Sequence, residues 1–266
     1  MRVTLSDSDR MYSGIIPAGG DTATPLNLTK RLGFFQRHGA LKGTRVLDCG
    51  CGAGEYVAAL RRAESEAYGV EFQREKIAEA YRRGIPPDWV KEGNLEHLEF
   101  VDESFDLAIL NEVLEHVPNE RQALTEVRRV LRPGGTLLVL SPNRLYPFET
   151  HGVRLRGSNY QVPHYVPFIP YIPLGLGRLF FDYWARNYWP RQLADLVSDV
   201  GFELVGTDYL WQTFENISGK QPRLIATLRP VLRTVARVAE RVPGIRRFGV
   251  SQAVIATKPA SERHAS

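Results

Sequence analysis

The stretch Val46-Leu47-Asp48-Cys49-Gly50-Cys51-Gly52-Ala53-Gly54 decides how this chain folds. It begins with apolar residues typical of a buried strand. An acid follows, glycines then stand at three alternate positions, and the sequence beyond them is typical of a helix. Glycine has no Cβ and adopts positive φ, so such a loop lets a ligand come close to the backbone. The stretch therefore predicts a ligand-binding loop between a strand and a helix.

The spacing of these glycines restricts the class of ligand. A dinucleotide-binding loop has the pattern G-x-G-x-x-G, which counted from Gly50 needs its third glycine at position 55. Glu55 stands there, and the observed pattern is D-x-G-x-G-x-G. This spacing disfavours a nicotinamide-dependent oxidoreductase.

Apolar segments that recur along the chain predict a sheet. Apolar residues at helical spacing separate most of them, beginning with a helix at 25–39 that Thr24 would cap. Strands alternating with helices predict an α/β fold with a doubly wound, mostly parallel seven-stranded sheet, which binds ligands at the carboxyl ends of its strands. The expected strands are 44–49, 67–70, 89–92, 105–110, 136–140, 202–206 and 252–257.

The length of the chain favours one α/β domain over residues 1–266. We expect an N-terminal arm and helix at 1–40, a lid insertion after strand five at 144–189, and a helical insertion before strand seven at 212–249. The N-terminus lacks the apolar core of a signal peptide, and no run approaches the about 20 apolar residues of a membrane-spanning helix. We therefore expect a cytoplasmic location.

The two cysteines, Cys49 and Cys51, both lie in the glycine loop. Their C-x-C spacing is neither that of a zinc knuckle nor that of a C-x-x-C redox pair. We interpret them as small loop residues in a reducing compartment, and we assign no metal-ligating residues.

Polar side chains follow the ends of several predicted strands. Asp48, Glu71, Asn94 and the pair Asn111-Glu112 all fall at such positions. Glu71 lies about twenty residues beyond the first glycines, where a carboxylate can accept hydrogen bonds from both hydroxyls of a ribose. Each residue taken alone also fits a solvated loop residue or a helix cap. Their joint placement indicates one ligand site at the edge of the sheet.

With these residues, the chain resembles the class I S-adenosylmethionine (SAM) dependent methyltransferases over roughly 44–142 and at its end. The resemblance implies SAM as cofactor, with its amino acid part at Gly50–Gly54, its ribose at Glu71 and its adenine at Asn94 and Leu95. The family more often has Asp where this chain has Asn94. It also implies a structural turn at Arg132–Gly135. The implied SAM-binding residues are Asp48, Gly50, Cys51, Gly52, Gly54, Glu71, Phe72, Asn94, Leu95, Asn111 and Glu112.

The lid insertion supplies candidate residues for the acceptor side. His151 follows the end of strand five by some ten residues, and an unperturbed histidine suits proton removal from a hydroxyl at neutral pH. Glu149 could orient it. His116 is the alternative base and His164 a third candidate. Each histidine could instead be a packed residue without a catalytic role.

The lid is rich in aromatic residues and is interrupted by prolines 163, 167, 170 and 173. A long aromatic insertion of this kind is more often functional than disordered. In the family that the chain resembles, additions at this point commonly cover the acceptor. The run that starts at Pro142-Asn143-Arg144 is similar to methyltransferases of cell-envelope glycan or lipid biosynthesis.

The second insertion predicts a basic amphipathic helix. Arginines recur every four residues from Arg229 to Arg241, and Glu240 is the only acid between 222 and 250. Leucines and valines occupy the other side, at 228, 231, 232, 235 and 238. The pattern is typical of a helix on an anionic membrane surface, and equally of a surface helix whose apolar face packs on the lid. The sequence disfavours a nucleic-acid partner, because its aromatic and arginine residues occupy separate segments.

These observations favour an O-methyltransferase, because the Asn-Pro-Pro-Tyr motif of amino-group methyltransferases is absent after strand four. The expected acceptor is a hydroxyl on a glycan, a lipid-linked molecule or another small molecule. Two alternatives stay open: C-methylation of a quinone or isoprenoid acceptor, and a SAM-binding module without catalysis. We expect the protein in the cytoplasm, with peripheral attachment to the inner face of the membrane as an open question. The sequence leaves the oligomeric state undetermined.

Overall fold

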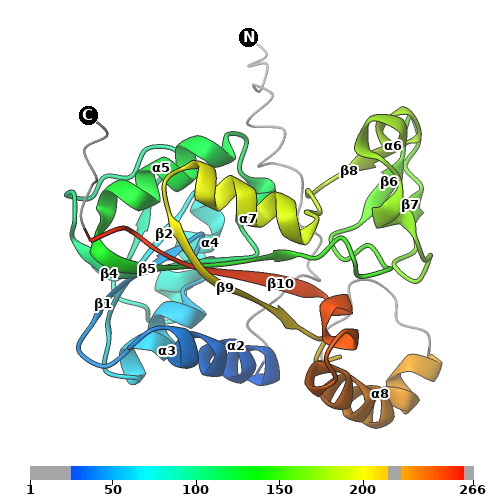
Figure 1. The fold of residues 1–266 in the computed structure, drawn as a ribbon, viewed down its shortest axis with the longest axis horizontal. Helices are drawn as coiled ribbons and strands as arrows, with labels where there is room; N and C mark the ends of the chain where they lie inside the picture. The colour runs from blue at the N-terminus through cyan, green and yellow to red at the C-terminus, as the bar shows by residue number, and fades with distance from the viewer. Residues whose placement is uncertain (1–24, 215–222, 261–266) are drawn as a thin grey trace.

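The computed structural model describes residues 25–214 and 223–260, and its centre is a seven-stranded sheet (Figure 1). Thr24 and the predicted N-terminal arm before it lie outside the described residues. The strands of this sheet are β1 (Arg45–Cys49), β2 (Glu66–Glu71), β3 (Val90–Glu92), β4 (Phe105–Asn111), β5 (Leu131–Pro142), β9 (Glu203–Leu210) and β10 (Ser251–Thr257). Their order is β3-β2-β1-β4-β5-β10-β9.

The pairing confirms the predicted fold class. β1, β2, β3, β4 and β5 run parallel, and β10 is antiparallel to both β5 and β9. The carboxyl ends of the five parallel strands therefore meet at one edge, which we call the ligand edge. Asp48, Glu71 and Asn111 lie on these strands, at or next to their last residues.

The strands of the centre are buried on both faces, as their apolar runs predicted. In β4, Leu107 and Ile109 face one hydrophobic core, while Ala108 and Leu110 face the other. The covering helices are α2 (Pro25–His38), α3 (Glu55–Arg62), α4 (Arg74–Arg82), α5 (Glu120–Val130) and α7 (Pro190–Asp199). Residues of α2, α3 and α4 belong to one core and those of α5 and α7 to the other, and α5 and α7 lie above the sheet in Figure 1.

β5 begins earlier than predicted and includes the turn expected at Arg132–Gly135, whose residues have no partner in the registers with β4 and β10. The register between β4 and β5 shifts between Phe105 and Leu107. Gly134 adopts a φ of +77°, and its N–H donates to Lys258 O at 2.8 Å. Gly134 bends the backbone here. Hydrogen bonds between Lys258 and the two glycines, Gly134 and Gly135, hold the segment beside the end of β10.

The lid is a small folded unit outside the main sheet. It holds the strands β6 (Val153–Leu155), β7 (Gln161–Val162) and β8 (Phe181–Tyr183) in the order β7-β6-β8, together with the short helices η2 (Ile169–Tyr171) and α6 (Leu174–Phe180). The buried Arg144 fixes its base, because its guanidinium donates to Pro170 O at 2.6 Å and to Ile172 O at 2.7 Å. The same guanidinium lies 5.1 Å from the ring centroid of Trp189.

The second insertion contains the predicted helix, α8 (Arg223–Arg241), and the short helix η3 (Ile245–Phe248). The buried Asn143 joins it to the start of the lid by donating to Arg247 O at 2.7 Å and Gly249 O at 2.8 Å. Because Ser251 pairs with Pro142 on one side and Leu210 on the other, both insertions leave the sheet at the ligand edge. Figure 1 shows the lid and α8 at this same end of the molecule.

The helices of the described segments were also compared with the dimensions of a bilayer. Between residues 25 and 214 and between 223 and 260, none combines the length and apolar character that crossing a membrane requires.

Candidate active site

The glycine loop forms a cradle at the end of β1. Gly50, Gly52 and Gly54 have φ values of +74°, +56° and +79°, a conformation that side chains with a Cβ rarely adopt. A Cβ on Gly50 would lie 2.6 Å from the Val113 side chain, whereas a Cβ on Gly52 would meet nothing within 4 Å. The loop therefore packs against the β4 end at Gly50 and leaves open space at Gly52.

Two carboxylates stand beside this cradle. Asp48 is buried, and its Oδ2 has no hydrogen-bond partner among the described residues. Burial, with smaller contributions from Glu71 and Glu55, raises the pKa of Asp48 to about 7. Glu71 Oε2 accepts a hydrogen bond from Gly52 N at 2.9 Å, and its Oε1 accepts from Gln73 N at 2.8 Å. Glu71 thus holds the glycine loop to the end of β2.

The positions expected near adenine differ in their exposure. Asn94 is partly exposed, and its Oδ1 accepts from Glu96 N at 2.9 Å. Phe72 is exposed beside Glu71. Leu95 is buried in the core that also contains Val70 and Cys49, so we expect any contribution of Leu95 to a SAM site to come through its backbone. Cys51 is buried, and both cysteines are free thiols.

The end of β4 carries a buried ion pair. Arg31 reaches it from α2, donating to Asn111 Oδ1 and, at 2.9 Å, to Glu112 Oε1. Ser251 Oγ also donates to Glu112 Oε1. Burial alone would raise the pKa of Glu112, but the charge of Arg31 and these hydrogen bonds hold it below its usual range. Glu112 has a φ of +59°, an uncommon conformation that is often found at functional sites.

His151 and His116, expected as alternatives, lie together. Their ring centroids are 5.1 Å apart. His116 is in the short helix η1 (Leu114–His116), which follows β4. The carboxylate nearest to the His151 ring is Glu115, whose Oε1 lies 3.5 Å from His151 Nε2. Residues that are far apart in the sequence thus form one cluster at the ligand edge.

Glu149 does not orient the His151 ring as expected. Its Oε1 accepts from the backbone N of His151 at 3.0 Å, and its Oε2 accepts from Asn187 Nδ2 at 2.7 Å. The buried carboxylate therefore fixes the main chain of the lid. His164 Nδ1 donates to Glu149 O at 3.0 Å and serves the same local structure.

Burial sets the charge of the histidine cluster. It lowers the pKa of His116 to about 4, with a smaller contribution from His151. It also lowers the pKa of His151, against the opposing effect of Glu112. Burial first, and then the charge of Glu112, raise the pKa of Glu115 well above its usual range. Both imidazoles are therefore neutral at pH 7 and carry a free lone pair.

Sequence reasoning missed Arg31 and Glu115. Arg31 lies on the apolar face of α2 between Leu28 and Phe35, at the spacing of core residues, and a charged residue there is a signal for a buried ion pair. Glu115 lies next to His116, three positions after Glu112. No local sequence pattern predicts its contact with His151 of the lid.

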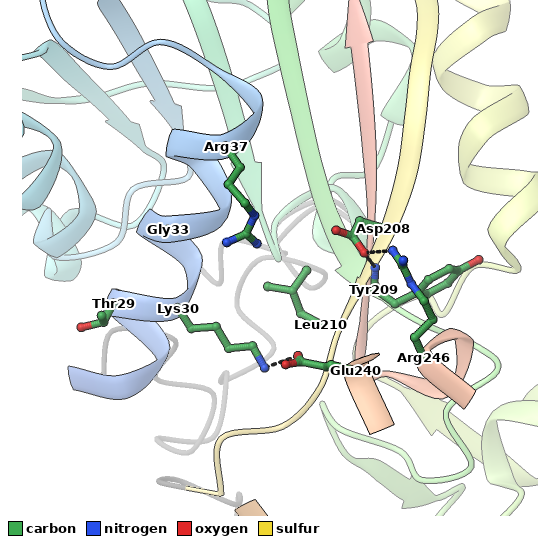
Figure 2. Close-up of a pocket in the computed structure, with 9 residues that line it drawn as sticks. All are labelled: Thr29, Lys30, Gly33, Arg37, Asp208, Tyr209, Leu210, Glu240 and Arg246. Carbon is green, nitrogen blue, oxygen red and sulfur yellow. Dashed lines mark hydrogen bonds and ion pairs between the residues drawn. The ribbon is translucent and has the colours of Figure 1, made fainter. Parts of the chain in front are cut away.

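A separate hollow of about 340 Å³ lies where α2 meets β9, α8 and η3 (Figure 2). Lys30 pairs with Glu240 there, and Arg246 pairs with Asp208. None of the predicted site residues lines it. The first pair joins α8 of the second insertion to α2, and the second pair joins η3 to β9.

Comparison with known proteins agrees with this geometry. Residues 47–139 match the family described as a methyltransferase domain. A probable SAM-dependent methyltransferase from Mycolicibacterium smegmatis is 30% identical over 149 residues, which cover 53% of this chain and 57% of that protein. A ubiquinone biosynthesis O-methyltransferase from Klebsiella pneumoniae is 32% identical over 119 residues, covering 43% of this chain and 49% of that protein.

A solved structure extends the match in the fold. A protein from Methanosarcina mazei described as a SAM-dependent methyltransferase superposes with a TM-score of 0.55 at 18% identity, covering 86% of this chain and 98% of that one. Residues 47–139 therefore match a methyltransferase domain and are similar to a probable SAM-dependent methyltransferase, and the solved structure supports the fold. The chain spans about half the length of the curated relatives that it matches.

Proposed function

We propose that this protein is a SAM-dependent methyltransferase that methylates a hydroxyl group. The observation that carries the proposal is the continuity between the two halves of the site. Gly50 of the loop abuts Val113, the next residue after Glu112, and Glu112 acts electrostatically on His151. A cradle for SAM and a neutral histidine thus lie on one continuous edge.

The cradle fits SAM on two observations of the structure. Asp48 Oδ2, which has no partner among residues 25–214 and 223–260, offers a buried acceptor for a hydrogen-bond donor of the ligand. The open space at Gly52 admits a ligand next to the backbone. Glu71 would accept hydrogen bonds from the ribose hydroxyls, and Asn111 with Glu112 would border the methionine part.

Methyl transfer from SAM is an in-line displacement at the methyl carbon attached to a sulfonium. The protein therefore has to align the acceptor oxygen and remove its proton. His151 Nε2 would accept that proton while the new oxygen–carbon bond forms. Burial lowers the pKa of His151, so the imidazole is neutral at pH 7, and with its one proton on Nδ1 beside Thr150 Oγ1 its Nε2 carries the free lone pair. The buried Glu149 would keep the lid backbone in place.

The acceptor that we favour is lipid-linked. One relative acts in ubiquinone biosynthesis by its name, and the lid exposes Tyr160, Tyr165 and Phe168. Exposed aromatic side chains suit the boundary between water and an apolar phase. C-methylation of a quinone-type acceptor is the alternative, since a carbon acceptor would use the same cradle.

We also propose that α8 attaches the protein to an anionic membrane, on the cytoplasmic side. The stripe Val231, Val235 and Val238 is 58%, 56% and 54% exposed, so it does not pack against the lid. The exposed Arg237 and Arg241 lie on the same helix. Apolar side chains in the headgroup boundary together with arginines at lipid phosphates define an interfacial helix.

Two measurements test the proposed activity. Calorimetry should show binding of SAM to the purified protein and none of NAD. Turnover should then appear with hydroxylated acceptors presented in detergent micelles, and labelled methyl groups identify oxygen or carbon as the site. SAM binding without turnover on any acceptor class would favour the non-catalytic module, and absence of SAM binding would reject the proposal.

A further inference from the structure

Three side chains at the ligand edge meet in the arrangement of metal ligands. One ligand atom each from Glu115, His116 and His151 lies within 4.8 Å of the others. Glu115 has no exposed surface, and its Oε1 has no hydrogen-bond partner in the described part of the chain. A buried carboxylate oxygen without a partner is costly, so this atom indicates a missing cation or donor.

The remaining polar atoms of the three side chains are held by the protein. His116 Nδ1 donates to Trp184 O, 3.2 Å away, since a carbonyl oxygen only accepts. His151 Nδ1 lies 3.1 Å from Thr150 Oγ1, and Glu115 Oε2 accepts from Ser141 Oγ at 3.3 Å. Metal-binding histidines and carboxylates are oriented by outer partners of this kind. Two Nε2 atoms and Glu115 Oε1 are left for a common ligand.

The separation of Glu115 and His151 suits a first-row transition metal. Zinc binds imidazole nitrogen and carboxylate oxygen at about 2.0–2.2 Å, which separates two tetrahedral ligands by about 3.4 Å. Glu115 Oε1 and His151 Nε2 are 3.5 Å apart. Two histidines and one carboxylate also form the ligand set of open zinc sites, in which a fourth position stays available.

The charged groups around Glu115 are also compatible with a bound cation. The buried cation of this edge, Arg31, is already paired with Glu112 at 2.9 Å. On binding, a divalent ion would take the place of the proton on the Glu115 carboxyl, and that proton would be released to water.

We propose that Glu115, His116 and His151 bind one divalent transition-metal ion, with a fourth position open to an oxygen ligand. Binding of the ion does not depend on the methyltransferase proposal. Its role in transfer does rest on that proposal: the acceptor hydroxyl would occupy the open position, where the ion lowers its pKa and the proton leaves to water. His151 Nε2 cannot hold a metal and a proton together, so with the ion bound His151 is a ligand and not the base.

Cobalt(II) is the probe that tests this site. Tag-free protein is stripped with a chelator and titrated with Co²⁺, followed by calorimetry and by the visible d–d absorption bands. We expect one equivalent to bind, with bands typical of a four- or five-coordinate ion. Glu115→Gln and His151→Asn should each weaken Co²⁺ binding at least tenfold, the loss typical even for outer-shell partners.

His164→Asn is the matched control, because His164 lies in the same lid, is not one of the three clustered ligands and hydrogen-bonds the backbone of Glu149. It should leave Co²⁺ affinity unchanged. SAM affinity, measured on every variant, reports folding and tests the cofactor site separately. Failure to bind a stoichiometric ion, or full affinity in both Glu115→Gln and His151→Asn, would overturn the metal site while leaving the SAM proposal intact. That outcome is expected if no metal binds and the protonated Glu115 carboxyl donates a hydrogen bond to His151 instead.

Discussion

The two halves of the ligand edge are built in different ways. The centre of the cofactor half is one continuous segment, Val46–Gly54, with Glu71 nineteen positions beyond Gly52, and its other residues follow at the ends of the next strands. The acceptor half draws Arg31 from α2, Glu115 from η1 and His151 from the lid, and Arg31 reaches Ser251 over 220 positions. A local motif constrains backbone conformation and is visible in the sequence, whereas a site assembled by tertiary contacts depends on where distant segments pack.

The largest effect is expected from filling the open space at Gly52, which tests the cofactor half alone. We expect Gly52→Val to abolish SAM binding, because a β-branched residue disfavours the φ of +56° and occupies the open space beside the loop. Gly43→Val is the control: Gly43 has a φ of +72° and open space as well, but lies before β1, away from the ligand edge. Calorimetry should show normal SAM affinity in the control. Normal affinity in Gly52→Val would contradict the assignment of the loop.

The acceptor half should fail without affecting the cofactor half. We expect His151→Ala to lower kcat by about 10²–10⁴ with little change in SAM affinity, as for loss of a base or of a metal ligand. His164→Ala should retain kcat. Single-turnover experiments measure the rate of methyl transfer in both variants, and calorimetry measures their affinity for SAM. A loss of only about two- to threefold would move the role of base to His116 or to a mechanism without one.

Asp48 links the cofactor half to stability. Its pKa is raised from 3.8 to about 7, so the folded state keeps a proton that the unfolded state loses above pH 3.8. Stability therefore falls as pH rises from about 4 to 7, and the full penalty remains above pH 7. At 1.36 kcal/mol per pKa unit this amounts to about 4 kcal/mol.

Asp48→Asn removes this penalty. We expect its free energy of unfolding to exceed that of the wild type at pH 8, with the difference vanishing near pH 4, while its SAM affinity falls. Urea unfolding at the two pH values measures the first effect and calorimetry the second. Equal stabilities at pH 8 would show that the folded state ionises Asp48 without cost.

A smaller effect is expected at the end of β2. Glu71→Ala removes hydrogen bonds of a charged group to the ribose, worth about 1.5–3 kcal/mol, or about 10- to 150-fold in Kd for SAM. Glu92→Ala is the control, because Glu92 ends the neighbouring β3 but pairs with the exposed Arg74. Unchanged SAM affinity in Glu71→Ala would limit Glu71 to its observed role of holding Gly52 N.

These regions also show what the sequence could reveal. The seven strands, the ligand edge and the cofactor half followed from apolar periodicity and glycine spacing, which act locally. The sequence could not reveal that Glu149 binds backbone while Glu115 faces His151, because both outcomes depend on how the lid closes on η1. Nor could it distinguish a buried from an exposed apolar stripe on α8, since the helical pattern is the same in both cases.

The smallest effect is expected for membrane binding by α8. If α8 lies on an anionic membrane, each arginine near the surface contributes about 1 kcal/mol, so Arg237→Ala should weaken binding to phosphatidylserine vesicles about fivefold. Arg62→Ala, at the exposed end of α3, should not. Val235→Glu should also weaken binding by placing a charge in the headgroup boundary.

Because the attraction is screened beyond a Debye length, added salt should reduce wild-type binding and the difference in binding between the wild type and Arg237→Ala. Co-sedimentation at low and high salt measures all three variants. If the wild type stays in the supernatant at low salt, α8 is no membrane anchor, and the acceptor is better sought among water-soluble molecules.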